Sequence, residues 1–330
     1  MTTPQFYQLH DSSSPAVLHA IRNELTTGLL AARAAVSPKY LYDALGSRLF
    51  DAITELPEYY PTRTEGAIVK QHLPHLAQQI PKGAALIDLG AGSCEKAEKL
   101  FDALQPAHYI PIDISVDYLR NTLYRLQRQY PMTRMSGVGL DFSAELTLPP
   151  ELLSLISGLP IVVFYPGSSI GNFSPDDARA LLARVQALCA QGAAGSGLLI
   201  GVDLTKASEI LEPAYDDALG VTASFNLNML LNINHLIGTD FDPQDWQHVA
   251  FFDAKLSRIE MHLQAKEEVT VNWPGHSRNF KRGEAIHTEN SYKWTVPGFA
   301  QLLQSAGFAA PTSYMDAKDW FSVHWALASA

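Results

Sequence analysis

The sequence feature that most constrains the fold is a glycine-containing turn between an apolar run and a helix-like segment. The apolar run 84–89 contains Asp88 near its end and passes into Gly90 and Gly92, and the helix-like segment 95–104 follows. Strand, tight turn and helix in this order form the first unit of a doubly wound α/β sheet. Glycines let the backbone approach a ligand closely, and the helix N-terminus offers free N–H groups. We therefore expect a ligand at this turn.

The residues of the turn also indicate what kind of nucleotide it accepts. A dinucleotide-binding turn has a third glycine three residues after the second, but Glu95 occupies that position here. A carboxylate there repels a pyrophosphate and suits a cationic ligand without phosphates, such as S-adenosylmethionine (SAM). A nicotinamide-dependent oxidoreductase is an alternative from another class, and Glu95 argues against it.

Two further strand ends carry acids in the positions that such a ligand needs. Asp113 ends the apolar run 109–113, about 20 residues after the turn, where an acid binds ribose hydroxyls. Asp141 and Phe142 follow a third apolar stretch, where an acid can accept from the adenine amine and an aromatic ring can stack on the base. Asp113 as a helix N-cap and Asp141 as a turn residue are the alternatives. The glycine turn and these two strand ends, in this order along the chain, predict a SAM-binding fold.

The fourth strand places more polar residues at the same edge of the sheet. Residues 160–165 are apolar throughout, which is typical of a strand buried on both faces. Ligands of open α/β sheets bind at the carboxyl ends of the strands. We therefore expect Gly167, Ser168 and Asn172, which follow this strand, on the rim of the active site.

The rest of the chain shows two patterns of secondary structure in turn. After a fifth strand at 197–203 the pattern changes to helix and then to half-buried strands, and from 292 a helix and two strands return. The Asp-x-Gly-x-Gly pattern of residues 88–92 resembles motif I of class I SAM-dependent methyltransferases. On that resemblance we predict an α/β fold: a seven-stranded class I methyltransferase (Rossmann-like) sheet with an antiparallel last strand, and a second α+β substrate domain. The predicted SAM-binding domain comprises 64–203 and 292–330, and the predicted substrate domain comprises 1–63 and 204–291.

Composition narrows the class of partner. The net charge is −10 and the pI about 5.5, with no Lys/Arg cluster, so a small molecule is expected rather than a nucleic acid. No apolar run reaches the ~20 residues that span a bilayer, and the start of the chain has no signal-peptide pattern. Two cysteines fit a reducing cytoplasm, and no spacing suggests a metal site. We expect a cytoplasmic monomer without a metal.

Motifs spread over nearly the whole chain resemble one family, the L-histidine Nα-methyltransferases of ergothioneine biosynthesis. The stretch from Leu56 to Glu65 is long enough to be specific. The segments that carry the resemblance are Pro38-Lys39, Tyr42-Asp43, Leu49-Phe50, Leu56-Pro-Glu-Tyr-Tyr-Pro-Thr-Arg-Thr-Glu65, Gly167-Ser168, Ile170-Gly-Asn172, Ala214-Tyr-Asp-Asp217, Gly220-Val-Thr222, Phe225-Asn226, Arg258-Ile-Glu-Met261 and Glu289-x-Ser291. The family belongs to the class I SAM-dependent methyltransferases and trimethylates the α-amine of histidine to hercynine.

The resemblance implies a set of roles. The cofactor positions are Gly90, Lys96, Asp113, Asp141 and Phe142, beside Asp88 and Gly92 of the glycine turn itself. The amino-acid head group is held by Tyr59, Asn172 and Tyr215, with Gly167 on the rim, and Tyr42 lies near the methyl-transfer centre, so Tyr42 and Asn172 are the expected catalytic residues. Glu289 and Ser291 bind the imidazole ring, and Met261 forms a wall of its pocket. Asn290 is polar where we expect an aliphatic residue in relatives, so it could change the shape or polarity of the pocket.

The chemistry of these residues agrees with methyl transfer to an amine, which depends mainly on positioning and desolvation. A carboxylate fits an imidazole N–H, and a hydroxyl beside it fits the second nitrogen.

The sequence leaves other roles open for two of these residues and for the whole chain. Glu289 could pair with Lys293 on a surface helix, and Met261 could be plain core. The substrate could be tryptophan or tyrosine, and the chain could be a non-catalytic SAM-binding module.

Overall fold

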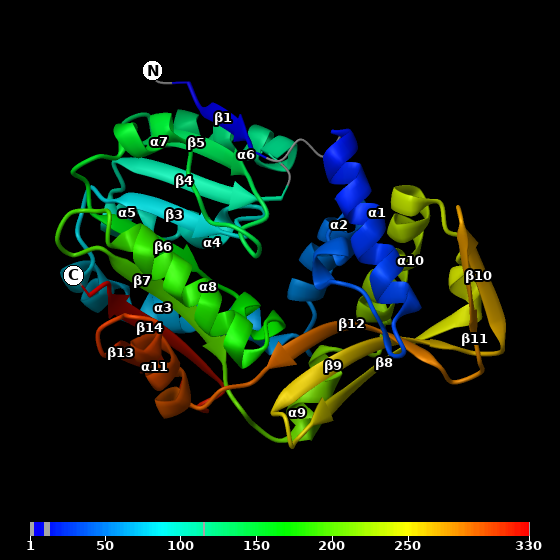
Figure 1. Ribbon diagram of the computed structural model, residues 1–330. Helices are drawn as coiled ribbons and strands as arrows, with labels where there is room; N and C mark the ends of the chain where they lie inside the picture. Colours follow the sequence, from blue (N-terminus) through cyan, green and yellow to red (C-terminus); the bar gives the residue numbers. More distant parts are fainter. Residues whose placement is uncertain (1–2, 10–13, 115, 330) are drawn as a thin grey trace. The chain divides into compact units, whose positions relative to one another are not determined.

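The computed structural model describes residues 3–9, 14–114 and 116–329, which form two compact units (Figure 1). Unit 1 comprises the described residues of 1–10, 63–204 and 294–330, and unit 2 those of 11–62 and 205–293. Among the described helices, none is long and apolar enough to cross a membrane.

Unit 1 is built on an eight-stranded sheet in the order β1-β5-β4-β3-β6-β7-β14-β13. All neighbours pair in parallel except β14, which is antiparallel to both β7 and β13. The parallel sheet with an antiparallel last strand in the chain agrees with the predicted class I methyltransferase sheet, and β3 and β6 lie at its centre. The strands are β1 (Gln5–Gln8), β3 (Ala85–Leu89), β4 (His108–Asp113), β5 (Arg134–Gly139), β6 (Ile161–Tyr165), β7 (Gly197–Asp203), β13 (Thr312–Met315) and β14 (Phe321–Leu327).

The eighth strand, β1, is a correction to the prediction of seven. It pairs in parallel with the neighbouring strand β5 and belongs to unit 1, whereas the sequence predicts residues 1–63 in the second domain. Two glycines of β5 allow this close approach. A Cβ on Gly139 would lie 2.3 Å from the side-chain Oε1 of Gln8, and a Cβ on Gly137 would lie 3.1 Å from the ring of Phe6.

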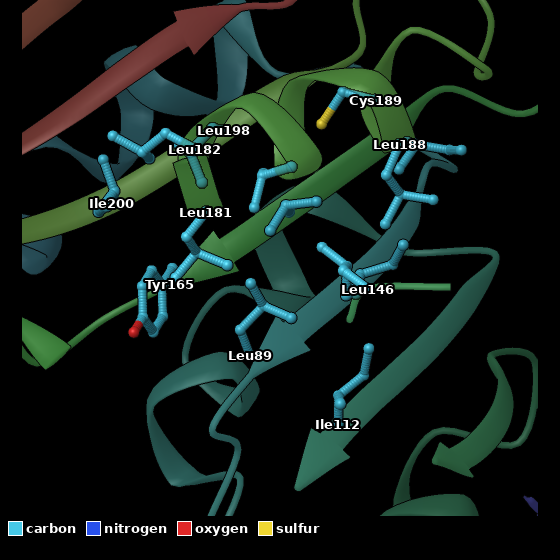
Figure 2. Packing of buried hydrophobic residues seen from close by; sticks show 14 of the residues in the cluster. Leu89, Ile112, Leu146, Tyr165, Leu181, Leu182, Leu188, Cys189, Leu198 and Ile200 are labelled. Atoms are coloured by element: carbon cyan, nitrogen blue, oxygen red, sulfur yellow. The ribbon is translucent and has the colours of Figure 1, made fainter. Parts of the chain in front are cut away.

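Helices cover both faces of this sheet, and apolar side chains fill the space between. Figure 2 shows Leu89 and Ile112 of the sheet in one apolar cluster with Leu181 and Leu182 of a covering helix. The helices of unit 1 are α3 (Tyr60–Gln79), α4 (Glu95–Glu98), α5 (Phe101–Leu104), α6 (Val116–Gln129), α7 (Pro150–Leu155), η2 (Ser169–Asn172), α8 (Pro175–Cys189) and α11 (Val296–Ser305). The first residues of α3 lie in unit 2. The helix begins at Tyr60, because Pro61 is tolerated in the first helical turn.

Unit 2 contains a four-stranded sheet in the order β2-β12-β9-β8 and a separate hairpin, β10-β11. Its strands are β2 (Ala34–Ala35), β8 (Trp246–Asp253), β9 (Arg258–Ala265), β10 (Val269–Trp273), β11 (His276–Phe280) and β12 (Ala285–Tyr292). Its helices are α1 (Pro15–Leu30), η1 (Pro38–Leu41), α2 (Ala44–Thr54), α9 (Ser208–Leu211), η3 (Glu212–Ala214), α10 (Val221–Ile237) and η4 (Pro243–Asp245). The alternation in the sequence predicts β9 and β10, but it does not predict β12.

A bulge in β12 decides which of its side chains face the core of unit 2. His262 of β9 lies opposite His287, and the next residue of β9, Met261, lies opposite Glu289, so Thr288 is an extra residue. An extra residue reverses the alternation of a strand. Glu289 and Ser291 therefore share the buried face with Met261. Without the bulge they would face outward.

Helix α10 binds the segment that precedes α2 through hydrogen bonds and packing. It packs against α1, α2 and η1 (Figure 1). The amide of Asn228 donates to Asp43 Oδ1 (2.7 Å), and that of Asn232 donates to the carbonyl of Tyr40 (2.8 Å). Asp43 Oδ1 also accepts from the backbone N–H of Gly46 as the N-cap of α2 (2.7 Å). One carboxylate thus holds two helices together.

Asp43→Ala is expected to lower the free energy of unfolding by about 2 kcal/mol, because it removes an N-cap and a second hydrogen bond together. Ser14→Ala is the matched control. Ser14 caps α1 through one hydrogen bond, from Val17 N at 3.3 Å, so its loss should cost about half as much. Urea unfolding followed by circular dichroism measures both. Equal losses would show that the bond from Asn228 contributes nothing.

Candidate active site

The glycine turn of unit 1 has the left-handed backbone that its sequence suggests. Gly90 and Gly92 have φ of +67° and +49°, and Cys94 has φ of +62°. The N–H of Gly90 donates to the carbonyl of Ile112 (2.9 Å), and that of Gly92 donates to Asp113 Oδ2 (3.1 Å). The turn after β3 is therefore anchored to the end of β4.

The end of β5 also converges on this turn. A Cβ on Gly90 would lie 3.9 Å from Cζ of Phe142, so the aromatic ring sits beside the glycine. The same ring packs edge-on against Tyr165 at the end of β6, with 5.7 Å between centroids. Asp141 Oδ1 accepts from the backbone N–H of Ser143 (3.1 Å) and from its hydroxyl. Asp113, Asp141 and Phe142 are thus brought to one edge of the sheet.

A buried glutamate of α3 connects the glycine turn to the loop after β6. Glu65 is 3% exposed; its Oε2 accepts from Lys96 Nζ (2.9 Å), and its Oε1 accepts from the backbone N–H of Gly167 (2.8 Å). Gly167 has φ of +81°, and a Cβ there would lie 3.0 Å from Lys96 Nζ. Asn172 ends the short helix η2 that follows. Sequence reasoning included Glu65 in a motif but gave it no role.

Asp88 lies beneath the turn, in the interior of unit 1. It is 2% exposed, its Oδ2 accepts from the hydroxyl of Tyr109 (2.7 Å), and its Oδ1 has no hydrogen-bond partner among the described residues. Burial raises the pKa of this carboxyl to about 7, against the hydrogen bond from Tyr109 and the charge of Lys96. Cys94 is buried as well, and burial raises the pKa of its thiol, so it has none of the character of a nucleophile.

Unit 2 holds a continuous row of aromatic side chains. The Tyr42 ring packs edge-on against Phe50 at 5.5 Å, Phe50 against Tyr59 at 6.0 Å, and Tyr59 against Tyr215 at 6.3 Å. Phe225 of α10 packs against both Tyr42 and Phe50. The row brings together the three tyrosines that the resemblance singles out. Aromatic faces of this kind attract cations.

The row ends on the buried face of β12. The hydroxyl of Tyr215 lies 2.7 Å from Ser291 Oγ. Glu289 and Lys293 flank Ser291 at alternate positions and are 7% and 3% exposed. Met261, 1% exposed, lies opposite Glu289 on β9. Glu289 and Lys293 therefore belong to a buried strand face and its continuation, and the alternative of an ion pair on a surface helix is wrong.

Burial changes the acidity of Glu289. Removal from water raises the pKa of its carboxyl to about 7, and the positive charge of Lys293 acts in the opposite direction. A carboxyl that titrates near neutral pH, on a buried face with hydroxyls and a cation, has the character of a functional site. Its chemistry suits recognition of a small ring that donates an N–H.

Asn290 faces the other way. It pairs with Glu260 on the outer face of the sheet, and its Oδ1 lies 3.0 Å from His287 Nε2. The structure therefore does not bring Asn290 together with Glu289 and Ser291, because neighbouring residues of a strand point to opposite faces. The metal-ligand atoms of Glu260, His262 and His287 on this face lie within 4.8 Å of one another. Glu260 is already paired with Arg258, whose charge opposes a cation there.

The expected site residues thus fall into two groups. Unit 1 carries the predicted cofactor residues together with Gly167 and Asn172. Unit 2 carries Tyr42, Tyr59, Tyr215, Met261, Glu289 and Ser291, with Asn290 on the opposite face of its strand. Glu65 and Lys293 are further members that sequence reasoning did not assign. Their partners are distant along the chain, although the two-residue spacing of Glu289, Ser291 and Lys293 is a signal in the sequence.

Comparisons with known proteins agree with the resemblance. The profile of a family described as "Histidine-specific methyltransferase, SAM-dependent" matches residues 21–328. A histidine N-alpha-methyltransferase of Mycolicibacterium smegmatis is 37% identical over 303 residues, which cover 89% of this chain and 91% of its own. One of Mycobacterium tuberculosis is 37% identical over 294 residues, 87% and 88% of the two chains. Ergothioneine biosynthesis protein 1 of Schizosaccharomyces pombe is 30% identical over 284 residues, 83% of this chain and 36% of its own.

Glu289→Gln is expected to stabilise the protein at pH 8 by about 1–3 kcal/mol and to leave its stability near pH 4.5 unchanged. The folded protein raises the pKa of Glu289 from 4.5 to about 7. The folded state therefore holds a proton that the unfolded chain loses, and the stability due to this group declines as the pH rises from 4.5 to 7. Urea unfolding at the two pH values measures the change.

The control for this prediction is Glu284→Gln. The guanidinium of Arg278 lowers the pKa of Glu284, so its stabilising contribution is present above its unfolded pKa and is lost as the pH falls. The substitution should therefore give no gain at pH 8. If Glu289→Gln also gave none, the carboxyl of Glu289 would not be destabilised by burial.

Proposed function

This chain belongs to the family of histidine-specific, SAM-dependent methyltransferases, and on that premise we propose that it transfers methyl groups from SAM to the α-amino nitrogen of L-histidine. Three transfers give hercynine, the trimethylated betaine, a step of ergothioneine biosynthesis. The observation that carries the proposal is the buried row of β12, where Glu289 and Ser291 stand at alternate positions beside the hydroxyl of Tyr215.

The cofactor fits the glycine turn of unit 1. When bound, SAM supplies an electrophilic methyl group on a sulfonium cation. Among the residues that the structure describes, none has an atom within 4 Å of a Cβ built on Gly92 apart from its chain neighbours, so the backbone is open to close approach. We assign Asp113 to the ribose hydroxyls, Asp141 and Phe142 to the adenine, and Lys96, held by Glu65, to the amino-acid end of the cofactor. The open turn, the acids and the adjacent aromatic ring support this assignment.

The head group of histidine is assigned to hydroxyl and amide donors. Tyr59 and Tyr215 lie next to each other in the aromatic row, and Tyr42 lies further along it. We assign to Asn172 the role that the family resemblance gives it, a carboxamide that holds the amine and the carboxylate. The amine must be neutral to attack the methyl group. The aromatic faces stabilise the positive charge that grows with each methyl group.

The imidazole ring is the part of histidine that the proposed site reads. Glu289 accepts a hydrogen bond from one ring N–H, and Ser291 pairs with the second nitrogen. Met261, opposite Glu289, packs against the ring. An indole has one N–H and no acceptor nitrogen, so it would leave the hydroxyl of Ser291 unpaired. Such mismatches penalise binding strongly.

Two properties outside the site belong to the same proposal. We propose that the protein acts as a monomer in a reducing compartment, the cytoplasm, on the free amino acid. Cys94 and Cys189 are both buried and free. Neither property enters the argument for the reaction.

The test of the proposed reaction is mass spectrometry of incubations with SAM and a panel of free amino acids. We expect histidine to gain three methyl groups and tryptophan and tyrosine to remain unchanged. Methylation of tryptophan instead would keep the reaction and overturn the role of Glu289 and Ser291. Absence of any product, with SAM bound, would identify a non-catalytic SAM-binding module.

Two substitutions separate the proposed binding roles of the two units. Glu289→Ala should weaken histidine binding at least tenfold, about 1.4 kcal/mol, and change SAM affinity less than twofold. Glu65→Gln should do the reverse, because it keeps an acceptor for Gly167 but removes the charge that holds Lys96. Isothermal titration with each ligand measures the effects. Equal losses of both ligands in either variant would show that the residue is structural.

A further inference from the structure

We propose that Lys293 is a positioning and specificity-determining residue: its ammonium group sets the hydroxyls of Tyr215 and Ser291 so that Ser291 donates a hydrogen bond to the unprotonated nitrogen of a neutral imidazole. The inference rests on the proposed function and deepens it, because it names the form of the ring that the site selects.

The position of Lys293 follows from the strand. It is the residue after β12 and continues the alternation of Glu289 and Ser291. Its backbone N–H donates to the carbonyl of Ser257 (2.7 Å), and its carbonyl accepts from the hydroxyl of Ser257 (2.9 Å). These bonds prolong the extended backbone by one residue. The side chain therefore points to the same buried face and is 3% exposed.

The ammonium group contacts both hydroxyls. Lys293 Nζ donates to the hydroxyl oxygen of Tyr215 (2.8 Å) and to Ser291 Oγ (2.8 Å), and the two hydroxyl oxygens lie 2.7 Å apart. Nζ also lies 4.6 Å from the centre of the Tyr215 ring. One cation thus holds two side chains that are 76 residues apart in the sequence.

Counting donors and lone pairs then gives the direction of each hydrogen bond. An ammonium group only donates, and a hydroxyl has one hydrogen and two lone pairs. A phenol is the stronger donor and the weaker acceptor of the two hydroxyls, so Tyr215 donates to Ser291. Ser291 Oγ then accepts from both Tyr215 and Lys293. Its lone pairs are filled, and its remaining capacity is to donate its own hydrogen.

A donor at Ser291 beside an acceptor at Glu289 matches one form of imidazole. The neutral ring has one N–H and one bare nitrogen, whereas the imidazolium ion has two N–H groups. The imidazolium would place an N–H against a hydroxyl whose lone pairs are filled. It would also bring a second positive charge toward the ammonium of Lys293. The site therefore selects the neutral ring.

The charges around Glu289 favour its role as the acceptor of the ring N–H. Lys293 lowers the pKa of this carboxyl against the effect of burial and so favours the ionised acceptor. On the same face of the sheet, His248 of β8 contacts the carbonyl of Tyr215 (2.8 Å), and burial lowers its pKa, so it is neutral. Met261 on β9 is uncharged. Glu260, His262 and His287 face the opposite side of the sheet.

The first experiment compares Lys293→Met with the unmodified enzyme. We expect KM for histidine to rise at least tenfold, kcat and SAM affinity to change less than threefold, and the acidic limb of the kcat/KM profile to move up by about one pH unit. The shift has this sign because loss of the cation raises the pKa of Glu289. Unchanged KM and pH profile, or an equal loss of SAM affinity, would overturn the proposal.

Lys206→Met is the matched control. Lys206 also donates to a tyrosine hydroxyl, that of Tyr60 (2.8 Å), and also lies 4.6 Å from the centre of its ring. It stands outside the row of Glu289 and Ser291. We expect its KM for histidine and its pH profile to match those of the unmodified enzyme. A shift as large as that of Lys293→Met would mean that the effect is general to lysines that donate to a tyrosine hydroxyl.

A second measurement needs no variant, so it holds even if Lys293→Met fails to fold. Nitrogen NMR of ¹⁵N-labelled histidine, bound with S-adenosylhomocysteine, reports the protonation of each ring nitrogen. We expect one protonated and one unprotonated nitrogen at pH 6. Two protonated nitrogens would overturn the proposal. Failure of the unmodified enzyme to bind and methylate histidine would instead refute the proposed function.

Discussion

Burying a carboxylate away from water is unfavourable unless other groups compensate its charge, and each unit of this protein contains such a carboxylate at its candidate site. In unit 1, Glu65 is buried against Lys96 and the backbone of Gly167. In unit 2, Glu289 is buried on the face that Lys293 also occupies. Each glutamate costs stability on its own. Glu65 is paired with Lys96, and the charge of Lys293 lowers the pKa of Glu289 against the effect of burial, so each glutamate is better explained by what it and the nearby lysine hold in place.

In unit 1 the result of the pairing is a fixed turn. Glu65 reaches from α3 to two segments that come from different strands, the glycine turn after β3 and the loop after β6. In unit 2 the result is a fixed set of donors and acceptors. The bulge at Thr288 turns Glu289, Ser291 and Lys293 to one buried face, and Tyr215 meets them there. A regular strand would place the same residues against water.

The sequence predicts the parts of this arrangement that depend on local pattern. The glycine turn and the acids at the ends of β4 and β5 lie in order along the chain, so the class I fold, the SAM cofactor and the family were all predicted and are confirmed. The N-terminal strand β1 was not predicted, because only the glycines of β5 make room for it. Strand β12 was not predicted either, because its bulge breaks the two-residue alternation. Glu65 and Lys293 had no assigned role, because their partners Gly167 and Tyr215 lie 102 and 78 residues away.

The central claim is that this chain presents the α-amine of histidine for methylation and holds the ring by its nitrogens. The most direct measurement is carbon and proton NMR of the product formed from histidine and SAM with a ¹³C-labelled methyl group. The account predicts one signal from three equivalent methyl groups on the α-nitrogen and unchanged ring protons. A labelled methyl group on a ring nitrogen would contradict it, because a ring held by Glu289 and Ser291 cannot also be the nucleophile.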